Sequence, residues 1–403
     1  MLLLIKLTDD AKIKDIFLVC NPCMRSYRSH KEFRSLSLAT DVVLAPCMFS
    51  EVQHLFISGH HEKNRPHHFV FCLMCYTQEA GVYYATIAII IVTSLFYCRK
   101  YIRGLQFEED VRADGKIVAV TGANSGIGQA VTAELNRRGA TVYMLVRDMQ
   151  RGTDSIRRLE KEGCDPQRLI LRLVDLADFG SLRKFTQSFC EEVPYLDVLI
   201  CNAGVLCVPT FTKTIDGFEK TWQCNYLGHF LLSEHLLPLI SKSADGRIIN
   251  ISSVLYEYAD TVSLDVVNDP KRYSGMMAYT RSKMAQVMYT RHLARIIEKR
   301  KLPLSVMVCH PGNVDSNILK ESGYQWVRVV FRPIMWYVLK TVDDGAQMPL
   351  YLALSKQLQN PNGQYYRNFA IHEVIAKCKD ADACKLLYEE SRKAAGLDRN
   401  PPV

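Results

Sequence analysis

Short apolar runs alternate with amphipathic stretches from Gly115 onward. A short apolar run bounded by polar residues is typical of a strand that is buried on both faces, and the stretches between the runs follow a helical period. Strands and helices in alternation predict an α/β fold, in which a doubly wound parallel sheet carries helices on both faces. We expect strands at residues 117–120, 141–145, 169–173, 198–201, 247–251 and 304–309.

The stretch from Gly81 to Cys98 contains no charged residue and is just long enough to cross the hydrocarbon core of a bilayer as a helix. Basic residues follow at once, beginning with Arg99, and membrane segments are commonly bounded in this way. A buried core helix is the alternative, but such helices are rarely apolar on every face. We therefore predict one transmembrane anchor at residues 80–98, with its basic flank and the rest of the chain in the cytosol.

Residues 1–79 precede the anchor and show no clear helical or strand period, so we predict a poorly defined extension. Two CxxC pairs and several histidines could in principle supply the four ligands of a zinc site. The chain between the pairs is far longer than in common zinc modules, so we predict no metal site. A start at Met74 is a further hypothesis, because it would make a compact N-terminal signal anchor. The cysteines are Cys20, Cys23, Cys72 and Cys75, and the histidines are His60, His61, His67 and His68.

Composition narrows the class of protein. The 403 residues suit one α/β domain with an appendage, and we place the domain at 115–370 and a C-terminal helix and tail at 371–403. The formal charge of +8 is scattered, so it suits a phosphorylated cofactor or an anionic membrane surface, and we predict no nucleic-acid partner. The 14 cysteines lack the regular framework of small secreted domains, which favours a reducing compartment.

A glycine-rich loop follows the first predicted strand directly, and a helix begins after it. Glycines let the backbone turn tightly and approach a pyrophosphate, whose charge is then met by the N–H groups of the helix N-terminus. A glycine triplet alone would indicate only a tight turn, but its place between a strand and a helix predicts a dinucleotide site. The predicted contacts are Gly122, Asn124, Ser125, Gly126, Ile127 and Gly128.

The end of the second predicted strand bears on the choice of cofactor. A carboxylate there suits the ribose hydroxyls of NAD, whereas a guanidinium suits the additional phosphate of NADP. Arg147 occupies this position and predicts NADP(H), while Asp148 beside it keeps NAD(H) as the less favoured alternative. Asp175, after the third strand, is a candidate hydrogen-bond partner for the adenine.

Tyr279 and Lys283 lie four positions apart, so both side chains project from one face of a helix. A free phenol has a pKa of about 10, which is too high for efficient proton transfer at neutral pH, and a neighbouring ammonium favours the phenolate. We therefore predict a lowered pKa for Tyr279 and a role as acid/base. A YxxxK pair on its own would more often be a surface contact.

Further motifs appear in a set order along the chain, and with them the region from Gly115 to about Tyr366 resembles the short-chain dehydrogenase/reductase family. The resemblance implies a Rossmann-like fold and hydride transfer between a nicotinamide and a carbonyl or alcohol carbon. The motifs are the glycine loop, Asn202-Ala203-Gly204, Asn225, Ser252-Ser253, Tyr279 with Lys283, and Pro311-Gly312.

The resemblance also implies a role for each matching residue. Tyr279 would donate or accept the proton, and Lys283 would lower its pKa and hold the nicotinamide ribose. Ser253 would orient the substrate oxygen, and Asn225 would support a proton-relay water. Beyond the glycine loop, Arg147 and Asp175, the implied cofactor contacts are Asn202, Ala203, Gly204, Tyr279, Lys283, Pro311, Gly312 and Val314.

Two departures from compact members point to one branch of the family. The chain between Ser253 and Tyr279 is longer, and Ser316 ends the segment after Gly312 where it could bind the nicotinamide amide. Both features resemble the retinol dehydrogenases, the WW-domain oxidoreductase and the X-linked dehydrogenase/reductase of polyprenol type. This branch implies a small lipophilic substrate of retinoid, polyprenoid or sterol type, an endoplasmic reticulum or other intracellular membrane, and a possible homodimer through the helix of Tyr279.

The segment from Tyr324 to Leu339 is aromatic and aliphatic, and it falls where the resemblance places a substrate-covering segment. It would line an apolar pocket or rest against a bilayer, with core packing or a dimer contact as the alternative. Two alternative functions use the same fold. A catalytically silent scaffold would show a damaged set of catalytic residues. A nucleotide-sugar epimerase would need a nucleotide pocket. His229 and His310 are predicted to be structural, because the mechanism already has its acid.

Overall fold

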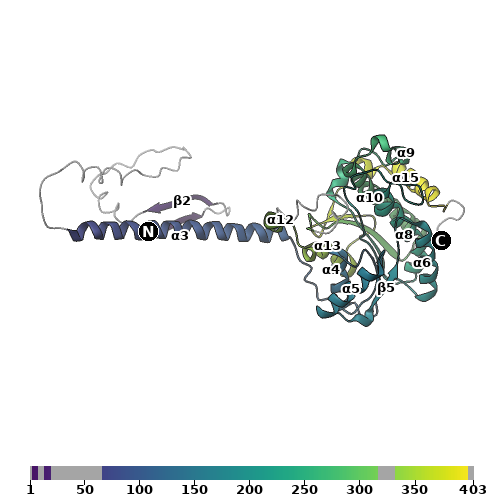
Figure 1. The fold of residues 1–403 in the computed structure, drawn as a ribbon, viewed down its shortest axis with the longest axis horizontal. Helices are drawn as coiled ribbons and strands as arrows, with labels where there is room; N and C mark the ends of the chain where they lie inside the picture. Colours follow the sequence, from purple (N-terminus) through teal and green to yellow (C-terminus); the bar gives the residue numbers. More distant parts are fainter. Residues whose placement is uncertain (1, 8–12, 20–65, 316–331, 398–403) are drawn as a thin grey trace. The chain divides into compact units, whose positions relative to one another are not determined.

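The computed structural model describes residues 2–7, 13–19, 66–315 and 332–397, and it describes side chains from residue 80 onward except at 332–334. The chain divides into two compact units, Met1–Val82 and Tyr83–Val403. The second unit contains the predicted α/β domain (Figure 1).

The first unit contains two strands that the sequence analysis did not predict. Strand β1 (Leu2–Leu7) pairs antiparallel with β2 (Ile13–Val19), with Leu2 opposite Val19. Both segments are rich in leucine and isoleucine, but neither alternates apolar and polar residues, so they lack the strongest sign of a strand. The cysteines and histidines considered as zinc ligands lie outside the residues whose side chains the structure describes.

The second unit is built around an eight-stranded sheet in the order β10-β9-β8-β7-β6-β3-β4-β5. All neighbours pair in parallel except the edge strand β10, which runs antiparallel to β9. The six predicted strands are confirmed, and the last two strands were not predicted. The strands are β3 (Ile117–Thr121), β4 (Thr141–Val146), β5 (Leu169–Leu173), β6 (Val198–Cys201), β7 (Gly246–Ile251), β8 (Leu304–His310), β9 (Tyr365–Arg367) and β10 (Ala370–His372).

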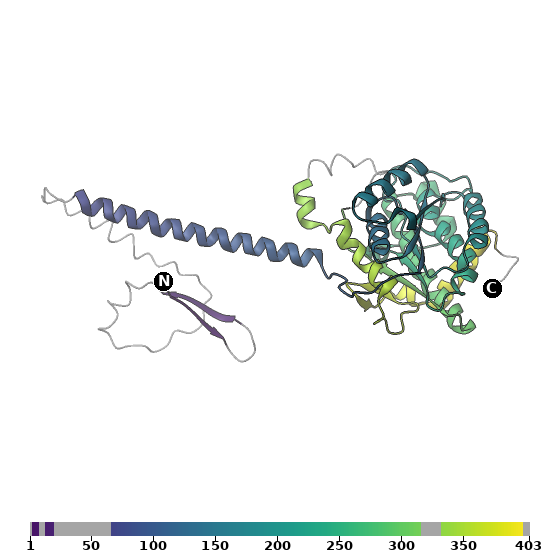
Figure 2. The ribbon, with the colours of Figure 1, turned by 90° about the horizontal axis from the view of Figure 1, so that it is seen from below.

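Helices cover both faces of the sheet, so the predicted doubly wound, Rossmann-like fold is confirmed (Figure 2). One apolar core lies under α4, α5 and α13, and the other lies under α6, α8 and α10. These helices are α4 (Gly126–Arg137), α5 (Met149–Lys161), α6 (Phe179–Glu192), α8 (Gly228–Ile240), α10 (Gly275–Arg300) and α13 (Val342–Leu354). Shorter helices are α7 (Lys220–Trp222), α9 (Leu264–Val267), α12 (Arg332–Val338) and α14 (Ala376–Lys379).

The strand order reverses at β3, which pairs with β4 on one side and with β6 on the other. Crossovers leave in opposite directions at such a point, so the loops after the two strands separate and open a crevice at the carboxyl edge of the sheet. The loop after β3 is the glycine-rich loop, and the loop after β6 carries Asn202. The topology therefore places the predicted cofactor residues at one crevice.

The predicted anchor is part of the long helix α3 (Pro66–Arg103). Within it, Ala80–Arg103 is long and apolar enough to cross a membrane, judged by length and composition only. Residues 81–98 are exposed on every side except at the partly exposed Ile87, unlike a core helix. The helix ends at Arg103, and Gly104 after it has a left-handed φ of 76°, which is common at helix C-termini.

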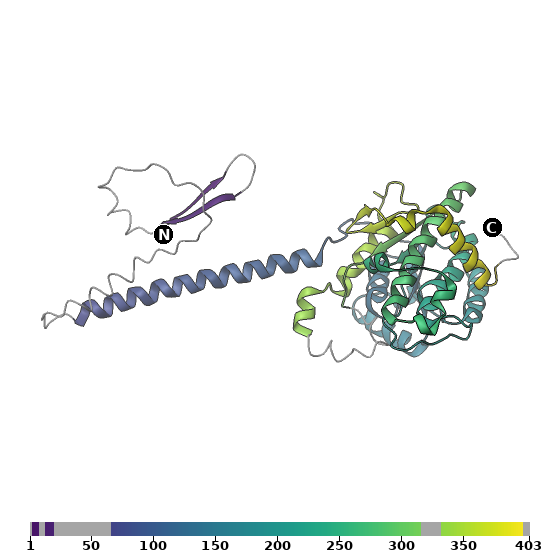
Figure 3. The ribbon, with the colours of Figure 1, turned by 90° about the horizontal axis from the view of Figure 1, so that it is seen from above.

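The C-terminal helix α15 (Ala381–Ala394) packs along α10 and helps to close one of the two cores (Figure 3). At its centre the buried Glu234 carboxylate of α8 accepts hydrogen bonds from Tyr289 of α10 (3.1 Å) and from Tyr388 of α15 (2.9 Å). Arg392 supplies a cation at 3.4 Å. The homodimer through α10 stays a prediction, and α15 occupies part of the α10 surface.

We predict that Tyr388→Phe lowers the free energy of unfolding by about 2 kcal/mol, because the buried Glu234 carboxylate loses a charge-assisted hydrogen bond. Chemical denaturation of the full chain in detergent measures the change. Tyr258→Phe is the matched control: its side chain is 72% exposed, and its effect should stay within about 0.5 kcal/mol. Equal effects in the two variants would show that this bond contributes nothing.

Candidate active site

A cavity of about 430 Å³ opens at the carboxyl edge of the sheet, at the crevice between the loops after β3 and β6. This volume is typical of sites for small ligands. The structure brings nearly all the predicted site residues to its wall. They are Gly122, Asn124, Ser125, Gly126, Ile127, Arg147, Asp175, Asn202, Ala203, Gly204, Ser253, Tyr279, Lys283, Pro311, Gly312 and Val314.

Gly128 and Asn225 are the predicted site residues that do not line the cavity, and both contact residues that do. A Cβ atom on Gly128 would lie 2.4 Å from the Asn202 amide nitrogen and 2.5 Å from the Gly122 carbonyl oxygen. Only glycine therefore permits α4 to begin this close to the loop, which brings the N-terminus of α4 to the cavity. Gly122 has a φ of 65°, which also favours glycine.

Thr121 joins the two loops of the crevice, and the sequence analysis missed it. Its hydroxyl oxygen accepts hydrogen bonds from the backbone N–H groups of Asn202 and Ala203, both at 2.9 Å. The same hydroxyl lies 2.8 Å from Nε2 of His229, and the Asn202 amide donates to the Thr121 carbonyl at 2.9 Å. The available signal was a threonine as the last residue of the strand before the glycine loop.

The helix N-terminus at the glycine loop is suited to an anion. Ser125 is the N-cap of α4, and its side chain makes no capping hydrogen bond. The first N–H groups of a helix have no partner within the helix, and the positive end of its dipole lies there. The loop, the close approach at Gly128 and this N-terminus together fit the pyrophosphate of a dinucleotide.

The residues near the far end of β4 separate into two functions. Arg147 is exposed and lines the cavity, and Arg151, which the sequence analysis did not consider, lines it too. The Asp148 carboxylate instead accepts a hydrogen bond from the backbone N–H of Arg151 at 3.0 Å and caps α5. Asp175 accepts from the backbone N–H of Ala177 at 2.9 Å, so part of its capacity stabilises its own loop.

Asn225 lies in a π-helical turn (Gln223–Leu227) between α7 and α8. Its side-chain oxygen accepts from the backbone N–H of Val205 at 2.8 Å, and its amide donates to the Ser282 hydroxyl at 3.0 Å. The side chain therefore ties the loop after β6 to α10. The wider turn leaves the Asn225 carbonyl oxygen accepting from Nδ1 of His229 at 3.0 Å and from the Gln286 amide at 2.9 Å.

Gln286 is a second residue that the sequence analysis missed. It lies three positions after Lys283 on the same face of α10, which was the signal available. Its side-chain oxygen accepts from the Lys283 ammonium at 3.0 Å, and that ammonium also donates to the Ile251 carbonyl at 2.7 Å. Gln286 therefore bridges Lys283 and the Asn225 carbonyl within the buried wall of the site.

The pKa values of the central pair differ from the expectation based on spacing. Burial raises the pKa of Tyr279 to about 12, while a hydrogen bond with Ser253 acts in the opposite direction. Burial also lowers the pKa of Lys283 to about 7. The Lys283 nitrogen lies 5.6 Å from the centre of the Tyr279 ring and binds other groups. The pKa of Tyr279 is therefore raised rather than lowered, contrary to the expectation from spacing, because burial is the largest effect on it.

Both histidines near the site are buried, and His310 also lines the cavity, so their structural role stays a prediction. Burial lowers the pKa of His229 to about 4 and that of His310 to about 4, so both rings are neutral at pH 7. His229 bridges Thr121 and the Asn225 carbonyl.

The predicted substrate-covering segment is described only in part. Met335 and Leu339 line the cavity, in agreement with the expected position of that segment. Residues 324–331 and Ser316 lie outside the described residues.

The fold and the cavity are those of a dinucleotide-binding α/β protein. The sequence matches the family model for short chain dehydrogenases over residues 116–325, and the chain belongs to this family. Human retinol dehydrogenase 14 is 38% identical over 296 residues, which are 70% of this chain and 87% of that protein. Bovine dehydrogenase/reductase SDR family member 13 is 36% identical over 287 residues, 70% of this chain and 74% of that protein.

Solved structures show the same architecture. An uncharacterized protein from Mycobacterium paratuberculosis has a TM-score of 0.59 and 30% identity, covering 74% of this chain and all of that chain. Pseudomonas aeruginosa RhlG, in an active-site complex with NADP, has a TM-score of 0.50 and 26% identity, covering 63% of this chain and 94% of that chain. The chain is therefore an oxidoreductase of a family that binds nicotinamide cofactors.

We predict that Lys283→Met has a higher free energy of unfolding than the wild type near pH 7. This difference should shrink as pH rises from about 7 to about 10. The folded pKa of Lys283 is about 7, below its ordinary value of 10.5. Between these values the unfolded wild type binds more protons than the folded form, so wild-type stability rises by up to about 1.4 kcal/mol per pH unit. Below about pH 7 the wild type bears the full cost of burying the charge.

Denaturation of both proteins across this pH range measures the difference. Lys271→Met removes an exposed lysine and serves as the control, with a difference that should not change with pH. The same flat behaviour in Lys283→Met would contradict the lowered pKa of Lys283.

Proposed function

We propose that this chain is an NADP(H)-dependent dehydrogenase/reductase that interconverts a lipophilic alcohol and its carbonyl compound. One observation carries the proposal: Tyr279 and Ser253, which acts on the pKa of Tyr279, both lie at the wall of a cavity that also contains the glycine loop. A proton donor and a second hydroxyl therefore face a site that suits a dinucleotide.

A bound nicotinamide would supply or accept the hydride. Tyr279 would give its proton to the substrate oxygen during reduction, or take it back during oxidation. Ser253 would donate a hydrogen bond to the same oxygen and stabilise its developing charge. A protonated Lys283 would favour the Tyr279 phenolate. Gln286 accepts a hydrogen bond from Lys283 and donates one to the Asn225 carbonyl, and so holds the lysine in place. Asn225 positions α10 against the loop after β6.

The preference for NADP(H) is supported by the charges near the end of β4. Arg147 and Arg151 offer guanidinium groups at the cavity, and guanidinium groups bind phosphates through paired hydrogen bonds. Asp148 caps α5, which leaves less of its carboxylate for a ribose hydroxyl. The NADP complex of RhlG is consistent with this preference.

The substrate class is supported by the relatives and by the cavity. Retinol dehydrogenases are among the similar proteins, and Met335, Leu339 and Val205 contribute apolar surface. We therefore propose a retinoid, polyprenoid or sterol-like substrate. We also propose that the candidate span Ala80–Arg103 anchors the protein in the endoplasmic reticulum or another intracellular membrane, with the α/β domain in the cytosol.

We predict that NADPH supports reduction of a long-chain carbonyl compound by the full chain in detergent. The panel contains retinal, a polyprenal, a sterol ketone and a small aldehyde, and oxidation of NADPH is followed by its absorbance. Tyr279→Phe should reduce turnover at least about 100-fold, because the proton donor is lost. Cofactor binding without turnover of any compound would instead favour a catalytically silent scaffold at a membrane.

We predict that Arg147→Ala weakens NADPH binding by about tenfold or more and leaves NADH binding nearly unchanged, because only NADPH carries the additional phosphate. Titration of cofactor fluorescence measures both affinities. Arg157→Ala removes a cation of α5 that does not line the cavity, and it should leave both affinities unchanged. Equal weakening of NADH and NADPH in Arg147→Ala would contradict the assigned role.

A further inference from the structure

The last turns of α3 are bonded to the helix that forms one wall of the cavity. The Arg99 guanidinium donates to the carbonyl oxygens of Tyr337 (3.2 Å) and Leu339 (2.7 Å) at the C-terminal end of α12. It also lies 5.1 Å from the centre of the Trp336 ring. A cation at a helix C-terminus satisfies carbonyl groups that have no partner within the helix. In return, the Tyr337 hydroxyl donates to the Leu95 carbonyl at 2.8 Å.

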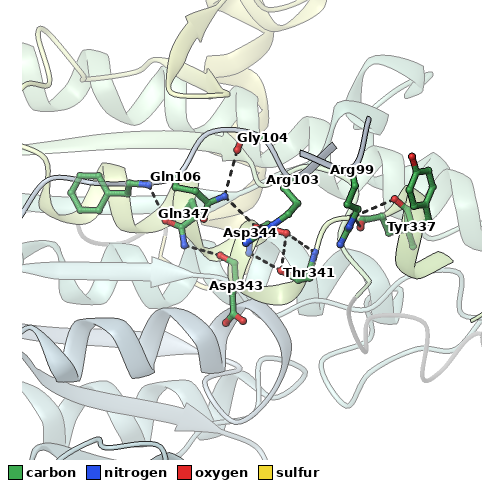
Figure 4. A network of polar contacts seen from close by, with 11 residues as sticks. Arg99, Arg103, Gly104, Gln106, Tyr337, Thr341, Asp343, Asp344 and Gln347 are labelled. Carbon is green, nitrogen blue, oxygen red and sulfur yellow. Dashed lines mark hydrogen bonds and ion pairs between the residues drawn. The ribbon is translucent and has the colours of Figure 1, made fainter. Parts of the chain in front are cut away.

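A second group of contacts follows directly along the chain. Arg103 and Gln106 both donate to the Asp344 carboxylate, at 3.0 Å and 3.2 Å (Figure 4). Asp344 is buried in the first turn of α13, where it also accepts from the Thr341 hydroxyl at 2.8 Å. The exit of α3 is therefore bonded to the start of α13 as well as to the end of α12.

The connection between these helices continues to the cofactor side of the cavity. The Lys340 backbone N–H donates to the Asn313 carbonyl at 2.8 Å, and the Asp315 N–H donates to the Lys340 carbonyl at 2.9 Å. Met335 of α12 and Leu339 of this connection line the cavity itself. The cavity wall thus lies between the candidate membrane span and the loop after β8.

The outer side of this wall is apolar and exposed. Trp336 is 61% exposed and Val338 is 48% exposed. Near them on α3, Leu95 is 49% exposed and Tyr97 is 67% exposed. Tryptophan and tyrosine beside basic residues are typical of the region where a membrane meets water. The exposed groups of α12 are thus continuous with the end of the candidate span, through the Tyr337–Leu95 bond.

We propose that α12 lies in the bilayer surface beside the end of the anchor, where the hydrogen bonds of Arg99 hold it. A substrate dissolved in the membrane then reaches the cavity past α12 without crossing water. The inference rests on the proposed anchor and lipophilic substrate. The opposite sides of α12 support it, because Met335 faces the cavity and Trp336 faces outward. The partner is a phospholipid bilayer rather than a second copy of the chain, because the exposed side adjoins a segment able to enter a bilayer.

The depth of Trp336 tests the position of α12. The full chain carrying Trp326→Phe is reconstituted in phosphatidylcholine vesicles, where Trp336 and the fully buried Trp222 remain. Adding Trp336→Phe provides the matched blank. Emission that depends on Trp336 should fall at least about twofold with lipids brominated on the acyl chain and should resist iodide in the water. Quenching by iodide alone, or protection from both quenchers by a dimer contact, would overturn the proposal.

Substrate delivery from vesicles tests the role of Arg99. Arg99→Gln should raise the KM for retinal carried in vesicles by about tenfold, because the two carbonyl bonds of α12 are lost, and should leave turnover of a small water-soluble aldehyde unchanged. Lys100→Gln removes an equal charge from an exposed neighbour and should change neither value. Cofactor affinity, measured in parallel, shows whether Arg99→Gln remains folded. Equal effects of Arg99→Gln on both substrates, or none on either, would overturn delivery past α12.

The two arms separate this inference from the proposed function. Fluorescence quenching needs no turnover, so it reports on α12 even if no carbonyl compound is reduced. If wild type reduces retinal in detergent but Trp336 is quenched only from water, the oxidoreductase function stands and the membrane-seated wall is rejected.

Discussion

The hydroxyl group of Thr121 is the interaction on which the site depends most. It accepts the backbone N–H groups of Asn202 and Ala203 and contacts His229, so the ends of β3 and β6 and the helix α8 meet at one oxygen. The parallel order of the sheet would open a crevice here in any case. The hydroxyl joins the two loops at this crevice, and Gly128 allows α4 to begin close to the glycine loop, so backbone groups form this part of the cavity.

The chemical end of the cavity is governed by burial. Removal from water raises the pKa of Tyr279 and lowers that of Lys283, which makes both neutral forms more accessible near pH 7. Among the described residues, the Ile251 carbonyl and the side-chain amide of Gln286 hold the Lys283 ammonium, and no carboxylate does. A buried lysine without a counterion is costly, and the same low polarity strengthens its interactions with any charge that forms beside it.

A short connection also relates the cavity to the proposed membrane anchor. Arg99 binds the end of α12, and Asp344 receives Arg103 at the start of α13, so the residues between them are fixed from both sides. Leu339 lies in this interval and lines the cavity. In a short-chain dehydrogenase with a lipophilic substrate, this arrangement would place the cavity next to the membrane in which the substrate is dissolved.

The sequence by itself predicted the doubly wound sheet, the glycine loop and the place of Tyr279 at the cavity, because strand periodicity and motif order can be read along the chain. It did not reveal Thr121, whose partners are distant in sequence, or the bond of Gln286 to the distant Asn225 carbonyl, nor the raised pKa of Tyr279, which depends on burial by several elements. The β1–β2 hairpin was missed because its strands do not alternate apolar and polar residues. The contact of Arg99 with Leu339 joins residues far apart in the chain, and only tertiary structure could decide such a pairing.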